Sequence, residues 1–269
     1  MKIVILLVSL LRLVNAINEQ LIHTSLNLSQ ATYCDNYWNC KTCDSENKLS
    51  YVIKSKGTKV LVGYNDKYKK YFVSYRGSSN LENWISNVQF TKIYPYNGLP
   101  SVGVDKGFYY EFKNNYKTIL KNLEKMDESY KCNEIIITGH SSGAAMATLL
   151  AYELETNYKV KYNVYSLITF GSPRVGNMDF TYVFRNYNFL SYRITHYYDI
   201  VPHLPQEKLD YNHIPSEIWY NQNNTEYKLC NDMYYEDESC SNSCYPYSCI
   251  STSDHMNYLN IRLGQNGDC

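Results

Sequence analysis

The segment from Glu134 to Thr148 constrains the fold of this chain more than any other part of its sequence. A β-branched run is followed by Gly-x-Ser-x-Gly, with Ser141 at its centre, and then by an alanine-rich stretch. Such a run is typical of a strand buried on both faces, and the small residues suit a helix packed close to a sheet. A serine at this strand-to-helix turn stands above the sheet at a helix N-terminus, where free N–H groups favour developing negative charge. The segment therefore predicts a nucleophilic serine on an α/β fold.

Glycines flank this serine on both sides. The turn is so tight that side chains at Gly139 and Gly143 would clash, and glycine removes that obstacle. A chance match to a short motif is the alternative interpretation. The predicted strand before the motif and the predicted helix after it favour the structural interpretation, because this context is what distinguishes the motif from chance.

Strand-like and helix-like segments alternate along much of the chain. The predicted strands are Leu49–Lys54, Val60–Tyr64, Tyr71–Tyr75, Glu134–Thr138, Tyr162–Phe170 and Leu190–His196. The predicted helices are Gly107–Met126, Ser142–Thr156 and Asp179–Asn188. This alternation predicts a mainly parallel sheet with helices on both faces. Because no helix separates the first three strands, that edge of the sheet is predicted to be antiparallel.

Residues 1–16 have the pattern of a signal peptide: a lysine, an apolar stretch and a small-residue cleavage site. The stretch is short for a membrane span, although an uncleaved anchor is the alternative. We therefore expect a protein that is secreted or enters a secretory-pathway lumen, with no stable transmembrane anchor. Residues 17–269 contain no repeat or linker and are predicted to form a single domain. Sequons at Asn27 and Asn223 permit glycosylation.

Nine cysteines agree with export. Eight lie near the two ends of the mature chain, which suggests disulfides that hold the chain ends in an oxidising compartment. The count is odd, and the isolated Cys132 is the candidate for the unpaired thiol. A zinc site on Cys40-x-x-Cys43 is the alternative, but a second pair at similar spacing is missing, since Cys240 and Cys244 fit poorly.

A serine hydroxyl needs a general base, and the base needs an orienting carboxylate. On a fold of this kind the expected chain order is serine, acid, histidine. Asp199 follows a predicted strand at the end where sites collect, and His203, His213 and His255 come after it. His255 lies in a cysteine-flanked segment that disulfides could hold over the sheet. A metal cluster that includes His196, Asp199 and His203 is a competing idea, but no hydrolytic metal motif accompanies it.

Five segments, in this order, resemble the class 3, fungal-type secreted lipases. They are Tyr75-Arg-Gly-Ser-Ser79 with Asn83-Trp84-Ile85, Gly139-His-Ser-Ser-Gly143, Thr169-Phe-Gly-Ser-Pro-Arg-Val-Gly-Asn177, Asp199-Ile-Val-Pro-His-Leu-Pro205 and Ser253-Asp-His-Met-Asn-Tyr258. The resemblance runs from about Cys34 to the last residue. It implies an α/β-hydrolase fold and ester hydrolysis.

The same resemblance assigns roles to individual residues. It implies that Ser141 is the nucleophile, Asp199 the orienting acid and His255 the base. Ser78 resembles the oxyanion-hole serine of the family, which gives its N–H and hydroxyl, and the backbone N–H of Ser142 would be the second donor. The other two candidate histidines then look structural.

A short apolar stripe follows the first matching segment. Leu81, Trp84, Ile85 and Val88 are spaced to lie on one side of a helix. Their position is similar to that of the lid that covers the site in this family and opens at a lipid surface. An ordinary core helix is the alternative, and periodicity does not separate the two.

Family disulfides suggest the pairs Cys34–Cys269, Cys40–Cys43 and Cys230–Cys240, and Cys244–Cys249 would be an added pair. Two positions depart from the family pattern. Ser142 stands where the family usually has a larger apolar residue, which puts the polarity of the acyl pocket in doubt. Asp105 stands where the family commonly has histidine.

The resemblance therefore predicts a secreted triacylglycerol lipase that forms an acyl-enzyme. A phospholipase or another esterase of the family is the alternative, and a non-catalytic lipid-binding homologue is a further one. No cofactor or metal is required. The expected partner is a lipid or other ester at a lipid–water interface, and we expect a monomer. Equal numbers of acidic and basic residues, 26 each, provide no net field for nucleic acid.

Overall fold

A computed structural model describes residues 17–35, 40, 43–55, 57–157, 160–233, 235–264 and 269. The predicted signal peptide, residues 1–16, lies outside these residues. Eight strands form the central sheet in the order β1-β2-β3-β6-β7-β8-β9-β10. Their bounds are β1 Asn47–Ser55, β2 Thr58–Asn65, β3 Lys70–Tyr75, β6 Glu134–His140, β7 Asn163–Phe170, β8 Leu190–His196, β9 Glu217–Tyr220 and β10 Tyr227–Leu229. Two small two-stranded sheets pair β4 (Lys92–Ile93) with β5 (Val104–Asp105), and β11 (Asn257–Tyr258) with β12 (Ile261–Arg262).

Strand directions confirm the predicted sheet. Strands β3, β6, β7, β8 and β9 are parallel, whereas β1, β2 and β3 pair antiparallel at one edge. At the other edge β10 pairs antiparallel with β9, and these two strands have no counterpart among the predicted ones. Both are short: β9 has only three consecutive apolar residues, and all three residues of β10 are exposed, so neither has an apolar run long enough to predict a buried strand.

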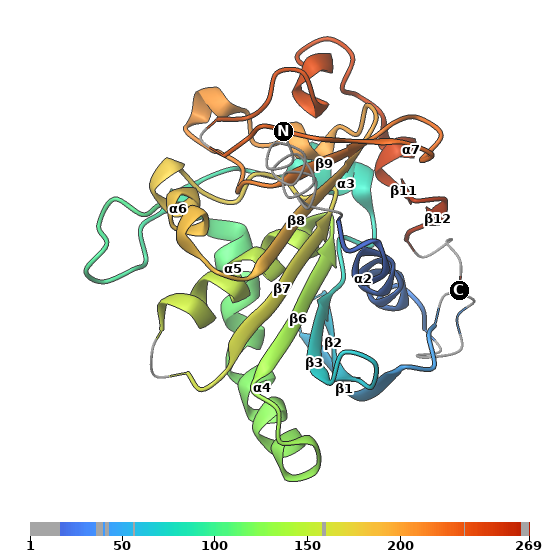
Figure 1. The fold of residues 1–269 in the computed structure, drawn as a ribbon. Coiled ribbons are helices and arrows are strands. Elements are labelled where there is room, and N and C mark those ends of the chain that lie inside the picture. The colour runs from blue at the N-terminus through green and yellow to red at the C-terminus, as the bar shows by residue number, and fades with distance from the viewer. Residues whose placement is uncertain are drawn as a thin grey trace, which may run out of the picture.

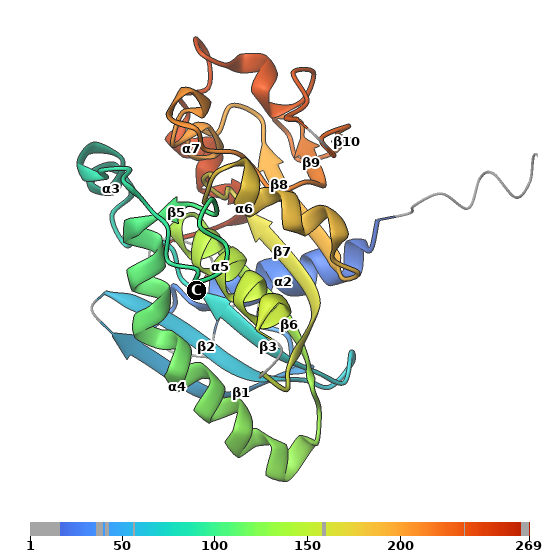
Figure 2. The same ribbon diagram turned by 90° about the vertical axis from the view of Figure 1, so that its left-hand side faces the viewer.

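Helices cover both faces of the sheet, as Figures 1 and 2 show. The bounds are α2 Glu19–Ala31, α3 Leu81–Asn87, α4 Lys106–Tyr130, α5 Ser142–Thr156, α6 Met178–Tyr182 and α7 Thr252–His255. Helix α2 packs on β3, β6 and β7 from one side, and α4 and α5 pack from the other. Side chains of β6 alternate accordingly: Ile135 and Ile137 belong to the core under α4 and α5, and Ile136 to the core under α2.

The predicted helix Asp179–Asn188 is the least accurate of the predicted elements. The α-helix there ends at Tyr182, and a 3₁₀ turn, Val183–Asn186, replaces its second half. Asn177 begins α6, since its side chain accepts a hydrogen bond from the N–H of Phe180. The helix predicted from Gly107 to Met126 is instead longer, and it ends at Tyr130, before Lys131 in the left-handed conformation.

Four disulfides confirm the pairings that the resemblance implied. They are Cys34–Cys269, Cys40–Cys43, Cys230–Cys240 and Cys244–Cys249. Cys132 is the free cysteine, also as predicted. The disulfide between Cys40 and Cys43 leaves neither thiolate for zinc, so the zinc alternative was wrong. Cys34 and Cys269 connect the chain just after α2 to the last residue, across a sequence separation of 235.

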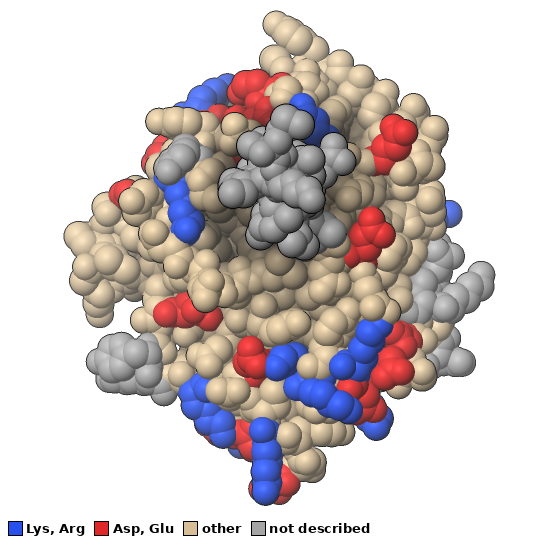
Figure 3. All heavy atoms as spheres, in the orientation of Figure 1, with Lys and Arg blue, Asp and Glu red and all other residues tan. Residues whose placement is uncertain are grey.

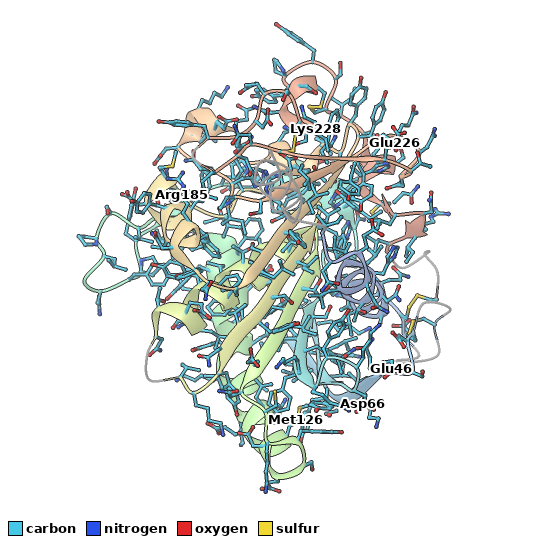
Figure 4. The ribbon with its side chains drawn as sticks, viewed as in Figure 1. Glu46, Asp66, Met126, Arg185, Glu226 and Lys228 are labelled. Atoms are coloured by element: carbon cyan, nitrogen blue, oxygen red, sulfur yellow. A yellow bond between two sulfur atoms is a disulfide. The ribbon has the colours of Figure 1, made fainter. Side chains whose placement is uncertain are left out.

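The carboxyl ends of β6, β7 and β8 meet at one rim of the sheet, which is uppermost in Figure 1. Glu226 and Lys228 lie at this rim in Figure 4, and Asp66 and Met126 lie near the opposite one. Ligand sites in open α/β sheets collect at the carboxyl ends of the strands. Among the described helices, none combines the length and the apolar character needed to cross a membrane.

Candidate active site

Ser141 occupies the turn between β6 and α5 and has a φ of 60°. A positive φ is a strained conformation for a residue with a side chain, and it is held here by the packing around the turn. A Cβ on Gly139 would come within 2.5 Å of the Gly143 carbonyl oxygen, and one on Gly143 within 2.4 Å of the Tyr75 carbonyl oxygen. The two flanking glycines are therefore needed for close backbone approach, as the sequence predicted.

Asp199 and His255 meet although 56 positions separate them. Asp199 follows β8, and its backbone forms a bridge with Ser251, the residue that caps α7. Helix α7 ends at His255 and so brings the imidazole to the carboxylate. Nδ1 of His255 lies 3.0 Å and 2.9 Å from the two carboxylate oxygens of Asp199. A carboxylate can only accept, so Nδ1 carries the proton, which leaves Nε2 as an acceptor.

Burial and hydrogen bonding oppose each other at this carboxylate. Burial alone would raise the pKa of Asp199, but the His255 charge and hydrogen bond, the Tyr258 hydroxyl and the Val201 N–H together lower its pKa below the ordinary value. The Val201 N–H donates to Oδ1 at 2.8 Å, and the Tyr258 hydroxyl donates to Oδ2 at 2.5 Å. Asp199 therefore remains ionised beside the imidazole.

Ser141 Oγ and His255 Nε2 are both buried, and neither has a hydrogen-bond partner among the described residues. They are thus not bonded to each other in this conformation. Gly171 lies against the acid and the imidazole: its φ is positive, and a Cβ there would lie 2.8 Å from His255 Nδ1 and 2.9 Å from Asp199 Oδ2. Without substrate, catalytic hydrogen bonds are often long and tighten in the Michaelis complex.

Tyr258 is a site residue whose role the sequence did not reveal. It stands within the last matching segment, but nothing in the chain around it indicates that its hydroxyl reaches back to a carboxylate. It is fully buried, and its ring packs edge-on against Phe170, the last residue of β7. Its hydroxyl donates a hydrogen bond to Asp199 Oδ2, in addition to the hydrogen bonds that Asp199 accepts from His255.

Replacing Tyr258 with phenylalanine should lower kcat about tenfold and change KM little. Hydrogen bonds to charged groups contribute about 1.5–3 kcal/mol, and 1.4 kcal/mol corresponds to a tenfold change in rate. The measurement is steady-state kinetics on a dissolved monomeric ester. Tyr227→Phe, at an exposed tyrosine on β10, is the matched control. Equal kcat in the two variants would rule out a positioning role for Tyr258.

His140, the residue before Ser141, packs behind the imidazole of His255. The ring centroids are 4.4 Å apart, and His140 Nε2 donates to the His255 carbonyl oxygen at 2.8 Å. The Tyr33 hydroxyl donates to His140 Nδ1 at 2.7 Å. Burial, and then the charge of His255, lower the pKa of His140 to about 3. This neutral ring joins the turn at Ser141 to the backbone of α7.

The other candidate histidines do not form a metal cluster with Asp199. In His196 one ring nitrogen lies 3.0 Å from the Asp254 carbonyl oxygen and the other 3.1 Å from the Gln222 carbonyl oxygen. His213 donates to the Pro202 carbonyl oxygen at 2.7 Å. His203 stacks on Tyr245 and lies beside a disulfide sulfur, and burial lowers its pKa to about 4. These contacts are structural.

Acidification from pH 7 to pH 5 should lower the free energy of unfolding. An unfolded histidine has a pKa near 6.5, whereas folding lowers the pKa of His140 to about 3 and that of His203 to about 4. Below pH 6.5 the unfolded state therefore binds more protons than the folded state. The free energy of unfolding then decreases as the pH is lowered, by up to about 1.4 kcal/mol per pH unit for each histidine. Urea unfolding at several pH values measures this slope. His203→Asn should make this slope smaller, whereas the control His23→Asn, at an exposed position, should leave it unchanged. An unchanged slope in His203→Asn would contradict the lowered pKa of His203.

The two predicted oxyanion donors lie together. Ser78 follows β3 and Ser142 begins α5, and their hydroxyl oxygens are 3.2 Å apart. Both line a cleft of about 310 Å³ that Trp84 and Met146 also line. The Ser142 N–H belongs to the first turn of α5, whose N–H groups have no intrahelical acceptor. The Ser142 side chain, which stands where the family usually has a larger apolar residue, thus forms a hydrogen bond with Ser78.

The predicted lid forms helix α3, and none of its residues is buried. It carries only three of the four predicted apolar residues, because it ends at Asn87 and Val88 is its extended C-cap. All four side chains are half-buried, and Trp84 stacks on Phe108 of α4 with centroids 6.2 Å apart. On its other side, the start of α3 lines a second cleft, of about 690 Å³, together with residues of α7 and β11. Ser141 and His255 beneath are 2% and 0% exposed.

Asp105, the second departure from the family pattern, has a structural place. It caps α4, since one carboxylate oxygen accepts from the Phe108 N–H at 3.1 Å, and the other accepts from the Tyr211 hydroxyl at 3.3 Å. Burial raises its pKa, which these hydrogen bonds partly oppose. Asp105 is thus a good N-cap residue.

The sheet and its strand-to-helix turn place the molecule among the α/β-hydrolases. Comparison with known proteins is more specific. The family model for class 3 lipases matches residues 72–209. A lipase of Rhizomucor miehei is 31% identical over 92% of this chain and 70% of its own length. A secreted mono- and diacylglycerol lipase of Fusarium solani is 32% identical over 67% of this chain and 54% of its own length.

A solved structure of a triacylglycerol lipase, in which a serine protease triad forms the catalytic centre, superposes with a TM-score of 0.81. It is 27% identical, and the match covers 93% of this chain and 98% of that one. The chain belongs to the class 3 lipase family.

Proposed function

We propose that this protein is a triacylglycerol lipase in which Ser141 is the nucleophile, His255 the general base and Asp199 the orienting acid. One observation carries the proposal: Asp199 holds Nδ1 of His255 with both oxygens. This leaves His255 Nε2, like the Ser141 hydroxyl, buried and without a hydrogen-bond partner in the part of the chain that the structure describes. Family membership supports ester hydrolysis as the reaction.

The reaction would proceed in two halves. His255 Nε2 takes the proton of Ser141 as Oγ attacks the ester carbonyl carbon, and the oxyanion accepts hydrogen bonds from Ser78 and from the N–H of Ser142. The bond to the alcohol then breaks, and His255 gives the alcohol oxygen its proton. Water attacks the acyl-enzyme with His255 again as base, and the acid leaves as Ser141 regains its proton. None of these steps calls on a metal or a cofactor.

A covered site implies a movement before substrate enters. Because Ser141 is almost fully buried, an ester carbonyl cannot reach it in this conformation. Helix α3 is suited to move, since its residues are exposed or half-buried and its apolar side chains would turn outward to a lipid surface. We assign α3 as the lid on this basis, with a lipid–water interface as the place of reaction.

Four disulfides and the signal-like start support export to an oxidising compartment. The related protein of Fusarium solani is described as secreted, which agrees. We propose a secreted monomer. We also propose glycosylation at Asn27 and Asn223. Treatment with an amidase that removes N-glycans should then lower the mass of the protein.

A fluorophosphonate probe tests the nucleophile. It should label the wild-type protein at Ser141 and fail to label Ser141→Ala, because the probe reacts with serine hydroxyls that a base activates. Ser142→Ala is the matched control and should still be labelled. An unlabelled wild-type protein would leave a non-catalytic lipid-binding protein as the better interpretation.

Substrate class is tested by comparing an emulsified triacylglycerol with the same ester below its solubility limit. A lipase with a lid should gain rate sharply when the emulsion forms. A phospholipase should prefer phospholipid dispersions, and an esterase for other substrates should show no gain at the interface. Either of the last two results would replace triacylglycerol as the substrate.

A further inference from the structure

An aromatic loop closed by a disulfide projects beside the site. The Cys244–Cys249 disulfide joins its two ends, and both cysteines are buried. Tyr247 and Ile250 are 87% and 70% exposed, and Tyr247 is the most exposed of the large apolar side chains in the described part of the chain. In Figure 1 this segment belongs to the orange-red part of the chain at the top.

The backbone of this loop is fixed, although its side chains are not covered. The N–H groups of Tyr247 and Ser248 both donate to the Cys244 carbonyl oxygen, at 3.2 Å and 2.8 Å. Tyr245 stacks on the buried ring of His203. The loop therefore presents Tyr247 and Ile250 in one arrangement, and binding through them costs little conformational entropy.

The loop is continuous with the segment that places the general base. Ser251 follows Ile250 directly; its N–H donates to the Tyr198 carbonyl oxygen at 3.0 Å, and α7 begins at the next residue. Residues of α7 and of the start of α3 both line the 690 Å³ cleft. The loop is thus joined through Ser251 to a helix that lines the same cleft as the start of α3.

Charge is absent from this part of the chain. No residue from Ser239 to Ser253 carries a charged side chain, although Glu236, Asp237 and Glu238 precede it. The uppermost atoms in Figure 3 are uncharged, and the charged side chains of this face lie below them, most densely at its lower end. Entry of such a loop into an apolar phase requires no charge to be desolvated. Tyrosine in particular suits a lipid–water boundary, because its ring is apolar and its hydroxyl is polar.

We propose that the loop Cys244–Ile250 docks the enzyme on an uncharged lipid surface, with Tyr247 and Ile250 inserted, so that the opening beside α7 faces the lipid. This inference rests on the proposed function, since it supplies the surface on which the substrate lies. The Cys244–Cys249 disulfide then has a purpose, which is to hold the loop tip rigid next to α7.

Vesicle binding tests the docking loop. The full chain with Ser141→Ala, which cannot alter the lipid, is mixed with phosphatidylcholine vesicles, and the bound fraction is measured by sedimentation. Adding Tyr247→Ser and Ile250→Ser should lower the partition coefficient at least tenfold, because two side chains lose their apolar burial. Tyr110→Ser, at an exposed tyrosine on α4, should lower it less than twofold.

Fluorescence gives a second readout at the same position. Tyr247→Trp in the Ser141→Ala chain should bind vesicles at least as well as its parent, because tryptophan favours the interface. Its emission should shift to shorter wavelength on vesicles by more than that of the parent chain. A loop that only stabilised the fold would produce no such extra shift.

Hydrolysis separates this inference from the proposed function. The active chain with Tyr247→Ser and Ile250→Ser should hydrolyse a dissolved ester within twofold of the wild-type rate and an emulsion much more slowly. Failure of the wild-type chain on the dissolved ester would refute the proposed function, whereas vesicle binding is read without any reaction. Unchanged vesicle binding by the double variant overturns the docking loop. Self-association that the double variant abolishes overturns it too, since a second copy would then occupy the loop.

Discussion

Asp199→Asn should lower kcat about ten-thousandfold on a dissolved ester at pH 7, because an amide in place of the carboxylate reverses the tautomer of His255. In the structure both oxygens of Asp199 accept from Nδ1–H of His255. An asparagine can present its NH₂ group to Nδ1, which must then be the acceptor, so the proton moves to Nε2. A protonated Nε2 cannot take the proton of Ser141.

Asp254→Asn provides the matched control. It makes the same chemical change next to His255, but there the structure uses only the backbone, whose N–H and carbonyl bond to Ser251 and His196. Its kcat should stay within about threefold of wild type. Circular dichroism of both variants checks folding. A rate for Asp199→Asn within tenfold of wild type would mean that another acid orients His255.

The sequence predicts those parts of the fold that have a local signal. The β-branched run Glu134–Thr138 and the alanine-rich Ser142–Thr156 are continuous in sequence, and each became the element predicted for it. The turn at Ser141 is equally local, because the flanking glycines are needed within five residues. Asp199 and His255 came from the order of elements and from the family resemblance, and their hydrogen bond was found between the two predicted residues.

Contacts across long sequence separations have no such signal. Tyr258 reaches Asp199 over 59 positions, and Tyr33 reaches His140 over 107. The chain has 30 tyrosines, and no local pattern distinguishes these two from the others. A salt bridge between two buried side chains, Arg193 on β8 and Glu217 on β9, is similar. The apolar run of β9 is only three residues long, and its pairing with β8 depends on packing that becomes visible only in three dimensions. Such networks can be found in a structure but not in a pattern of residue types.

Ser78→Ala should lower kcat by a factor of about a hundred to a thousand, with little change in KM, because an oxyanion donor acts in the transition state rather than in the ground state. Ser78 is half-buried and lines the 310 Å³ cleft, and the Ser142 hydroxyl, 3.2 Å from the Ser78 hydroxyl, aligns it without a substrate. Single-turnover kinetics on a dissolved ester measures the acylation step directly.

Three variants separate the hydroxyl of Ser78 from its surroundings. Ser78→Thr keeps a hydroxyl and should restore most of the activity, whereas Ser79→Ala alters an exposed neighbour and should change little. Ser142→Ala removes a hydroxyl but keeps the backbone N–H, so it should cost less than tenfold, the part that comes from aligning Ser78. If Ser142→Ala were as damaging as Ser78→Ala, the Ser142 hydroxyl itself would be the donor. The oxyanion would then lie nearer to α5 than to the end of β3.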